Sequence, residues 1–389
     1  YIGLGYHPAA IPAVIQRNIF ENPGWYTAYT PYQAEIAQGR LEAILNYQTT
    51  IIELTGMEIA NASLLDEGTA AAEAMALLFD VRTRDQKKNN INKLFVSEEI
   101  LPQTLSVLQT RATPKGIELV VGNHETFDFS SDFFAAILQY PGKFGQVHDY
   151  ASFIAKAKEN EIKVAVAADI LSLVKLTPPG EMGADVVLGT TQRFGIPLGY
   201  GGPHAAYFAT KDAFKRGMPG RLIGVSIDAQ GNRALRMALQ TREQHIKREK
   251  ATSNICTAQA LLANMAVMYA VYHGPDGLKA IATRVHALAQ GLAQQLESLG
   301  IQQVNEFYFD TLHLTGFDAN KLFEHANKHA VNFNYFANGT VSISVDETTS
   351  VKDIQSIVHL FETLTGKTAK ALNANIKNAA IPAQLVRTS

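Results

Sequence analysis

Short apolar runs alternate with helical stretches between residues 61 and 210, and this alternation constrains the fold more than any other feature of the sequence. Runs typical of buried strands occur at residues 93–96, 117–121, 163–168, 186–189 and 205–209. Helical patterns separate several of them, at residues 69–79, 103–111 and 150–159. Because strands linked by crossover helices assemble side by side, the pattern predicts an α/β domain with a mostly parallel sheet.

The large domain is expected to cover residues 61–273, and three further parts flank it. Residues 1–60 combine an aromatic, Pro-interrupted arm with a helical pattern over residues 34–52. After a Gly-Pro helix stop, residues 274–365 predict a smaller α+β domain. Residues 366–389 lose periodicity and are expected to form a linker or tail.

The overall composition excludes several classes of protein. Hydrophobic residues make up 47% of the 389 residues, enough for a large core, and the net charge of −2 argues against a nucleic-acid-binding protein. No apolar run approaches the ~20 residues needed to cross a bilayer, so no membrane segment is expected. The chain lacks an initiating Met, which suggests a piece of a longer protein.

Cysteine and histidine usage argue against a metal centre. The single cysteine, Cys256, cannot form an internal disulfide or a cysteine-based metal cluster. The eleven histidines do not fall at metal-ligand spacing, so no metal is expected. Low cysteine usage fits a reducing compartment, the cytoplasm of a bacterium or the mitochondrial matrix of a eukaryote.

Three features follow one another in an order typical of one class of enzyme. A helix of small residues starts around Thr69, where free backbone amides could bind a phosphate, although a well-capped core helix explains this feature better when it is taken alone. Asp169 follows the buried strand at residues 163–168, and a glycine-rich loop covers residues 192–203. This order is the layout of a pyridoxal-phosphate enzyme of the aminotransferase type, in which the acid pairs with the pyridine nitrogen.

The loop that holds the Schiff-base lysine in such enzymes holds no lysine here. It offers Gln192 and Arg193 instead. An amide or a permanently protonated guanidinium cannot form the imine with the coenzyme. No catalytic residue of this type is therefore expected in the chain.

Six stretches of the chain carry long and specific motifs. They are residues 29–33 (YTPYQ), 38–42 (QGRLE), 61–74 (NASLLDEGTAAAEA), 199–204 (GYGGPH), 241–246 (TREQHI) and 250–257 (KATSNICT). Together these stretches resemble the P-protein family of the glycine cleavage system, the glycine dehydrogenases (decarboxylating). The resemblance covers nearly the whole chain and is weakest in the smaller domain and the tail.

The resemblance implies a type I aminotransferase fold and a role as one half of a larger enzyme. P-proteins resemble two tandem halves of this fold, or two subunits in some bacteria, and the C-terminal half holds the lysine and the pyridoxal phosphate. This chain resembles the N-terminal half, with Gln192 in place of the lysine and with Asp169 and Thr69 as remnants of a cofactor site. Leu101 stands where relatives of this half usually carry a histidine, which further weakens the case for a second cofactor.

By the same resemblance, the assembled enzyme decarboxylates glycine and transfers the aminomethyl group to the lipoyl group of the H-protein. The expected partners are thus the C-terminal half, the lipoylated H-protein and glycine. The charged run at residues 242–250 could dock the H-protein, but a solvated helix face explains it better.

Two groups of side chains are expected to reach into the pocket of the other half. They are Tyr29, Tyr32 and Gln33 in the substrate tunnel, and Thr252, Ser253 and Asn254 at the cofactor phosphate. Ordinary packing in an interface between the halves is an equally good explanation of both groups.

Two alternatives to this companion role remain open from the sequence. The chain could be a self-sufficient pyridoxal-phosphate enzyme that uses another lysine, such as Lys175 near Asp169. It could also be a purely structural module that binds the H-protein and forms no part of a pocket.

Overall fold

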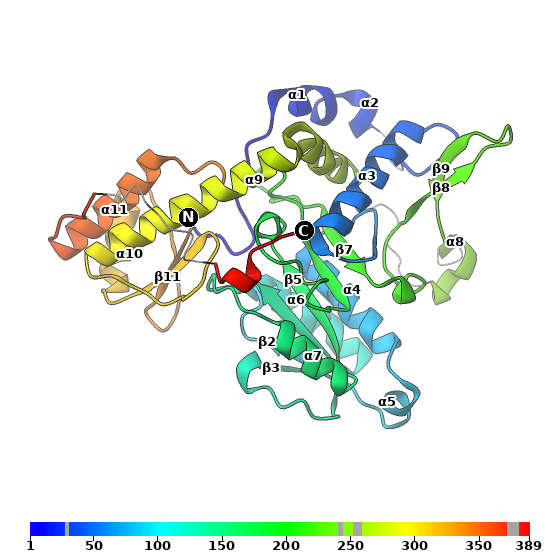
Figure 1. The fold of residues 1–389 in the computed structure, drawn as a ribbon, viewed down its shortest axis with the longest axis horizontal. Coiled ribbons are helices and arrows are strands. Elements are labelled where there is room, and N and C mark those ends of the chain that lie inside the picture. The colour runs from blue at the N-terminus through cyan, green and yellow to red at the C-terminus, as the bar shows by residue number, and fades with distance from the viewer. Residues whose placement is uncertain (28–30, 240–243, 252–258, 372–380) are drawn as a thin grey trace.

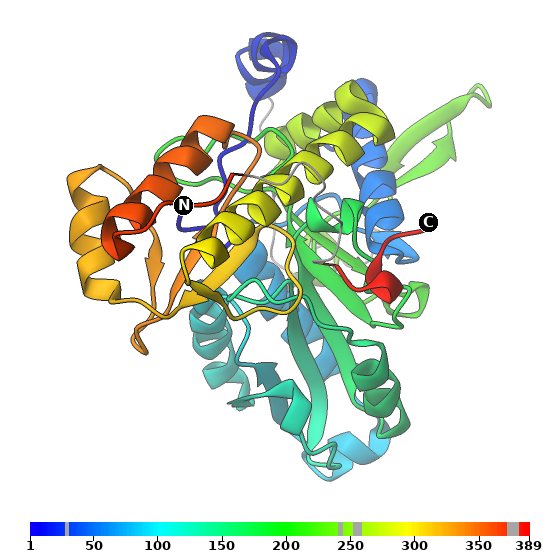
Figure 2. The ribbon, with the colours of Figure 1, turned by 60° about the vertical axis from the view of Figure 1, so that its left-hand side comes forward.

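The computed structural model describes residues 1–27, 31–239, 244–251, 259–371 and 381–389 of the chain. A large α/β domain and a smaller α+β domain lie side by side, and the long helix α9 (Ala260–Ser298) runs from one to the other (Figures 1 and 2). In the described residues no helix is both long and apolar enough to cross a membrane.

The large domain is built on a seven-stranded sheet with the order β1-β7-β6-β5-β4-β2-β3. Strands β2 to β6 pair with one another in parallel. At one edge β7 runs antiparallel to β6, and β1 runs antiparallel to β7. This confirms the prediction of an α/β fold with a mostly parallel sheet. The strands are β1 (Ile59–Ala60), β2 (Lys93–Ser97), β3 (Glu118–Gly122), β4 (Phe133–Tyr140), β5 (Lys163–Ala168), β6 (Val186–Thr190) and β7 (Ala206–Thr210).

Helices cover both faces of this sheet, as continuous apolar strands require. The core on one face contains α4 (Glu67–Asp80) and α6 (Pro102–Ala112), and the run of buried alanines in α4 lets its backbone approach the strands closely. The core on the other face contains α3 (Gln38–Thr55), α7 (Ala151–Glu159) and part of α9. Shorter helices are α1 (Ala13–Ile15), α2 (Pro23–Tyr26), α5 (Arg84–Lys88) and α8 (Gln244–Lys247).

Helix α9 is interrupted where the sequence predicts a stop. Gly274 has φ 64° and ψ 179°, which is not helical, and Pro275 follows it. A positive φ is easily reached only by glycine, so this residue lets two helical segments meet at an angle. The second segment then packs against the smaller domain.

The smaller domain consists of an antiparallel sheet with the order β10-β11-β13-β12 and two helices. Both helices begin at a capping side chain, Asp318 for α10 and Ser350 for α11. The elements are β10 (Gln302–Gln303), β11 (Thr311–Thr315), α10 (Ala319–Lys328), β12 (Asn334–Tyr335), β13 (Val341–Ser344) and α11 (Val351–Thr365).

A two-stranded hairpin, β8 (Ile223–Ile227) and β9 (Arg233–Met237), projects from the large domain and is not predicted by the sequence (Figure 1). Two glutamines of α3 hold its base. Gln38 exchanges two hydrogen bonds of 2.9 Å with the backbone of Leu235, and Gln48 exchanges two, of 2.8 and 3.0 Å, with the backbone of Ile223.

The C-terminal end of the chain returns to the large domain. Residues 366–389 were expected as a linker or tail, yet Ile381 and Leu385 are buried. Arg387 donates hydrogen bonds to the backbone carbonyls of Leu54 and Leu173 at 2.9 and 2.7 Å. The described end of this segment is therefore attached to the core.

Candidate functional site

Asp169, Gln192 and Arg193, three residues singled out from the sequence, lie at the carboxyl edge of the parallel strands, where open α/β folds bind ligands. Asp169 directly follows β5, and its Oδ1 accepts the backbone N–H of Ser172 at 2.7 Å. Arg193 follows β6, and Glu67 begins α4 beside them. A small cavity lies among these side chains.

Arg193 supplies the positive partner of Asp169 from within the chain. Its guanidinium is 4% exposed and binds the carboxylates of Asp169, at 3.2 Å, and of Asp310 in the smaller domain. Burial opposes this charge, but attraction by the two carboxylates outweighs burial and raises the pKa of Arg193. The guanidinium therefore takes the position beside Asp169 that a protonated pyridine ring would need.

Gln192, which the sequence predicts to stand in place of the Schiff-base lysine, makes hydrogen bonds only to backbone groups of the chain. The side chain is fully buried. Its Nε2 donates to the backbone carbonyls of His7 and Ile196, both at 2.7 Å, and its Oε1 accepts the backbone N–H of His7 at 3.2 Å. The amide thus ties the start of the chain into the site.

Residues 1–8, here called the N-terminal plug, lie between the two domains, where they separate the small cavity beside Asp169 from a larger one of about 800 Å³. Gln103 donates to the Leu4 carbonyl at 2.7 Å, and Ser344 at the end of β13 donates its N–H to the Tyr1 carbonyl at 3.0 Å. A Cβ on Gly3 would overlap the Ser344 hydroxyl. Gly3 and Gly5 are too few glycines for a nucleotide-binding motif. They instead allow the plug backbone to pass close to neighbouring side chains.

The plug also accounts for Leu101, the departure from the family pattern. A Cβ on Gly5 would lie 3.0 Å from the Leu101 side chain, so leucine packs against the plug backbone. His7 is buried beside Arg193, and burial followed by repulsion from that cation lowers the pKa of His7 to about 3. The plug therefore presents a neutral imidazole to the site at neutral pH.

Two acidic side chains occupy the start of α4, where a phosphate was considered from the sequence. Asp66 caps the helix by accepting the N–H of Thr69 at 2.7 Å, so this amide already has a partner. Glu67 accepts the hydroxyl of Thr104 at 3.0 Å, and burial raises the pKa of Glu67 to about 7. Carboxyl groups at this helix end disfavour the binding of a phosphate.

The residues present do not fit pyridoxal phosphate. The cavity beside Asp169 measures about 50 Å³, whereas sites for small molecules usually enclose at least ~300 Å³. The acid is neutralised by Arg193, the helix start is acidic, and Gln192 cannot form an imine.

Two lysines lie near this site in different ways. Lys175 was considered as an alternative Schiff-base lysine, but its Nζ donates to Thr283 of α9 at 3.1 Å, and it does not line the cavity. Lys143, in the loop after β4, does line the cavity. Lys143 was not predicted from the sequence because that loop carries no recognisable motif.

Of the residues expected to reach the other half, the structure describes Tyr32 and Gln33. Tyr32 is buried in a small hydrophobic cluster beneath the hairpin, with Leu41, Ile44 and Leu235. Gln33 is exposed next to it. The remaining candidates lie outside the described residues: Tyr29, Thr252, Ser253 and Asn254.

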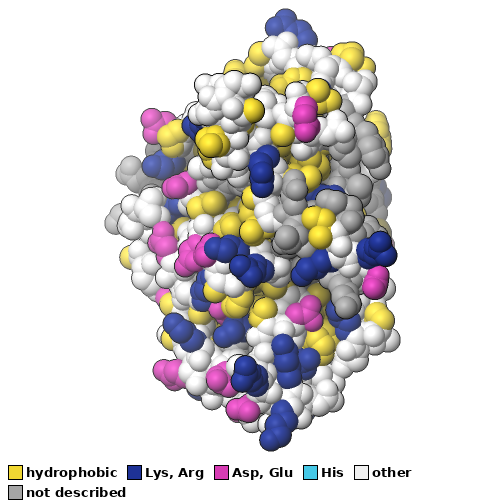
Figure 3. Space-filling view, turned by 90° about the vertical axis from the view of Figure 1, so that its right-hand side faces the viewer, with side chains coloured by type: hydrophobic (Ala, Val, Ile, Leu, Met, Phe, Trp, Pro, Cys, Tyr) yellow, Lys and Arg dark blue, Asp and Glu magenta, His cyan; other side chains and the backbone are white. Residues whose placement is uncertain are grey.

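The hairpin leaves part of an apolar face uncovered. Ile223 and Leu235 pack beneath it, while Val225 and Ile227 continue the same face outward and are 58% and 72% exposed. Figure 3 views the molecule from this side and shows hydrophobic side chains exposed among Lys and Arg side chains. Exposed apolar surface of this kind is typical of an interaction site.

Comparison with known proteins gives a consistent result for the sequence. The family model "Glycine cleavage system P-protein" matches residues 1–361. The chain is 74% identical, over 389 residues, to the glycine dehydrogenase (decarboxylating) of Flavobacterium johnsoniae. The match covers 100% of this chain but only 41% of that protein, so the chain spans less than half the length of such relatives.

Solved structures resemble the chain over most of its length. A glycine decarboxylase (P-protein) of the glycine cleavage system, in inhibitor-bound form, superposes with a TM-score of 0.85 at 31% identity, covering 94% of this chain and 84% of that one. An aspartate aminotransferase from Thermus thermophilus superposes with a TM-score of 0.58 at 13% identity, covering 92% and 97%. The second likeness concerns the fold alone and agrees with the type I aminotransferase fold.

Proposed function

This chain belongs to the glycine cleavage system P-protein family, and from that premise we propose that it is the half of a glycine dehydrogenase (decarboxylating) that holds no coenzyme. It acts as a companion to the C-terminal half. The observation that carries the proposal is the filled site, in which Arg193 occupies the place beside Asp169 and Gln192 is bonded to the plug. A chain closed in this way has no room for chemistry of its own there.

The companion role lies in shaping the pocket of the other half. In this proposal the outer face of the hairpin, with Val225 and Ile227, packs against the C-terminal half, because exposed apolar side chains gain most from burial. Tyr32 supports the hairpin from below, and Gln33 lies at the surface beside it. Tyr29, Thr252, Ser253 and Asn254 remain proposed contributors to the substrate tunnel and the cofactor phosphate.

The whole enzyme would act on glycine and on the lipoyl group of the H-protein. Pyridoxal phosphate, held by the C-terminal half, supplies the electron sink that lets glycine lose its carboxyl group as CO2. The residues of this chain contribute binding surface and fixed geometry, which lower the entropic cost of bringing the reactants together.

Reconstitution with the C-terminal half tests this proposal. We expect the isolated chain to show neither glycine–bicarbonate exchange nor an absorbance band of bound pyridoxal phosphate, and the mixture to restore exchange. A Gln192→Lys variant should still bind no coenzyme alone, because the plug and Arg193 keep the site filled. No gain in exchange on mixing would contradict the companion role.

Borohydride trapping separates the companion from a self-sufficient enzyme. Reduction of the chain in the presence of pyridoxal phosphate, followed by peptide mass spectrometry, should give no stoichiometric pyridoxyl-lysine. Lys143→Met and Lys175→Met variants assign any adduct that does form. A stoichiometric adduct at either position, lost in the matching variant, would favour the self-sufficient alternative.

A further inference from the structure

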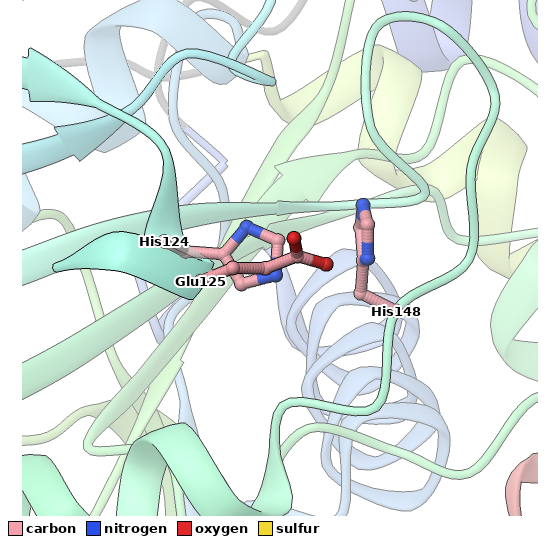
Figure 4. Close-up of side chains that lie close together, drawn as sticks. All are labelled: His124, Glu125 and His148. Atoms are coloured by element: carbon pink, nitrogen blue, oxygen red, sulfur yellow. The ribbon is translucent and has the colours of Figure 1, made fainter.

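Two histidines and a glutamate meet away from the filled site, although the sequence predicts no metal there. His124 and Glu125 begin the 3-10 turn η3 (His124–Thr126) after β3, and His148 lies in the loop between β4 and α7. One ligand atom from each residue lies within 4.8 Å of the other two. Figure 4 shows the Glu125 carboxylate lying between the two imidazole rings.

The two imidazoles are held in place by their aromatic neighbours. Their ring centroids are 4.5 Å apart with the planes at 70°. His124 also packs edge-on against Tyr150 at 5.1 Å and Phe153 at 6.4 Å, and His148 lies 5.7 Å from Tyr150. Ring positions fixed in this way limit the entropy lost when a ligand binds.

The cluster leaves a buried nitrogen without a hydrogen bond. His148 Nε2 is inaccessible and has no hydrogen-bond partner among the residues that the structure describes. A neutral imidazole nitrogen without a hydrogen bond offers its lone pair to a cation.

Nearby charges favour a cation in this place. The carboxylates of Glu98 and Glu125 lie close enough to His124 to interact with it electrostatically. Both carboxylates and Lys143 also interact electrostatically with Glu99, and burial raises the pKa of Glu99 to about 7. Neutral imidazoles beside carboxylates form a donor set suited to zinc and similar transition metals. Zinc bonds of about 2.0–2.2 Å require the three ligand atoms to close in slightly, which the exposed Glu125 side chain can do by rotation.

We propose that His124, Glu125 and His148 form a binding site for a divalent transition-metal ion, zinc foremost, with an open coordination position. The ion joins the turn after β3 to the loop after β4, and so fixes two connections at the carboxyl edge of the sheet. This inference is independent of the companion role proposed above.

Titration of the metal-free chain tests the site. Isothermal titration with zinc and visible spectroscopy with cobalt(II) should both show one site per chain. His148→Gln and Glu125→Gln should each weaken zinc binding about tenfold or more, because each removes a ligand. Zinc should raise the melting temperature of the unmodified chain and leave that of the His148→Gln variant unchanged.

A second histidine pair provides the matched control. His325 and His329 lie one turn apart on α10 with ring centroids 4.9 Å apart. A His325→Ala/His329→Ala variant should bind zinc and cobalt like the unmodified chain. Loss of binding in that variant, or full binding in Glu125→Gln, would overturn the proposal. If circular dichroism shows that His148→Gln is misfolded, the exposed Glu125→Gln variant decides the matter.

Discussion

The cleft between the domains and the outer end of the β8–β9 hairpin differ in how they are covered. In the cleft, Gln192 binds the plug, Arg193 binds the carboxylates of Asp169 and Asp310, and the cavity beside Asp169 measures about 50 Å³. On the hairpin, Val225 and Ile227 continue an apolar face past the helix that supports its base. One region is covered by the chain itself, and the other is exposed.

The contrast indicates which property each region supports, stability in the cleft and assembly at the hairpin. A cleft that binds no coenzyme can be filled with side chains that add stability, since buried groups with partners cost little. A hairpin that only packed against its own domain would carry polar residues at Val225 and Ile227. Changes in the cleft should therefore alter folding, whereas changes on the hairpin should alter assembly.

The largest effect is expected at Arg193. Arg193→Leu leaves the buried Asp310 and the partly buried Asp169 without a cation, and should lower the free energy of unfolding by about 3–5 kcal/mol in a urea titration. Lys93→Leu breaks an exposed ion pair with Asp132 and should cost less than about 1 kcal/mol. Equal losses in the two variants would show that the buried ion pairs do not close the cleft.

A pair of glycine substitutions compares the plug with the hairpin turn directly. Gly3 and Gly231 both have a positive φ, so Ala at either position carries a strain of about 1 kcal/mol. Only at Gly3 would the new Cβ overlap Ser344, while nothing lies within 4 Å of one on Gly231. Gly3→Ala should therefore cost about 2–4 kcal/mol of unfolding free energy and Gly231→Ala about 1 kcal/mol. Equal costs would mean that the plug is loosely held.

The pH dependence of stability tests the acidic helix start in the cleft. Since the pKa of Glu67 is about 7 when folded and near 4.5 ordinarily, the folded state holds this proton more firmly. Its contribution to stability is present below pH 4.5 and is lost as the pH rises to 7. Glu67→Gln should match the unmodified chain at pH 4.5 and be more stable by roughly 1–3 kcal/mol at pH 8.

The control for this series is Glu118→Gln, on the exposed first residue of β3. That substitution should change the free energy of unfolding by less than about 0.5 kcal/mol. Glu99 also has a pKa of about 7, and its effect on the pH dependence of the unfolding free energy is the same in all three proteins. This effect therefore cancels when the proteins are compared. A gap for Glu67→Gln that is constant with pH would contradict burial of this carboxyl.

The smallest effect on the chain itself is expected on the hairpin. Val225→Ser and Ile227→Ser should change the free energy of unfolding by less than about 0.5 kcal/mol, because both side chains are exposed. They should nevertheless weaken binding of the C-terminal half about tenfold in a titration, as central apolar contacts do. Val351→Ser, at an equally exposed position of α11, should change neither quantity.

The sheet was predictable because its strands are continuous apolar runs. Strand β5 coincides with the predicted run, and β2, β6 and β7 differ from theirs by a residue. The hairpin was missed because its residues mix Gly, Ser and Arg with apolar side chains, and its only local signal is a turn. Its position depends on Gln38 and Gln48 of α3, far away in the sequence.

Individual residues of the site could be predicted from the sequence, but the contacts that fill the site could not. Asp169 and Gln192 could be placed because each follows a buried strand. The partnership of Arg193 with Asp310 joins residues 117 positions apart in different domains, and no local pattern records it. The same holds for the plug, and for His124 and His148, which only the fold brings together.

Arg193 connects two properties that are separable in most enzymes, the orientation of two domains and the availability of a pocket. Replacing Arg193 alone leaves two carboxylates without a cation. Replacing Gln192 alone releases the beginning of the chain, and removing the N-terminal plug alone leaves a void. Each of these single changes should give a less stable protein, so opening a coenzyme site here would require several coordinated changes at once.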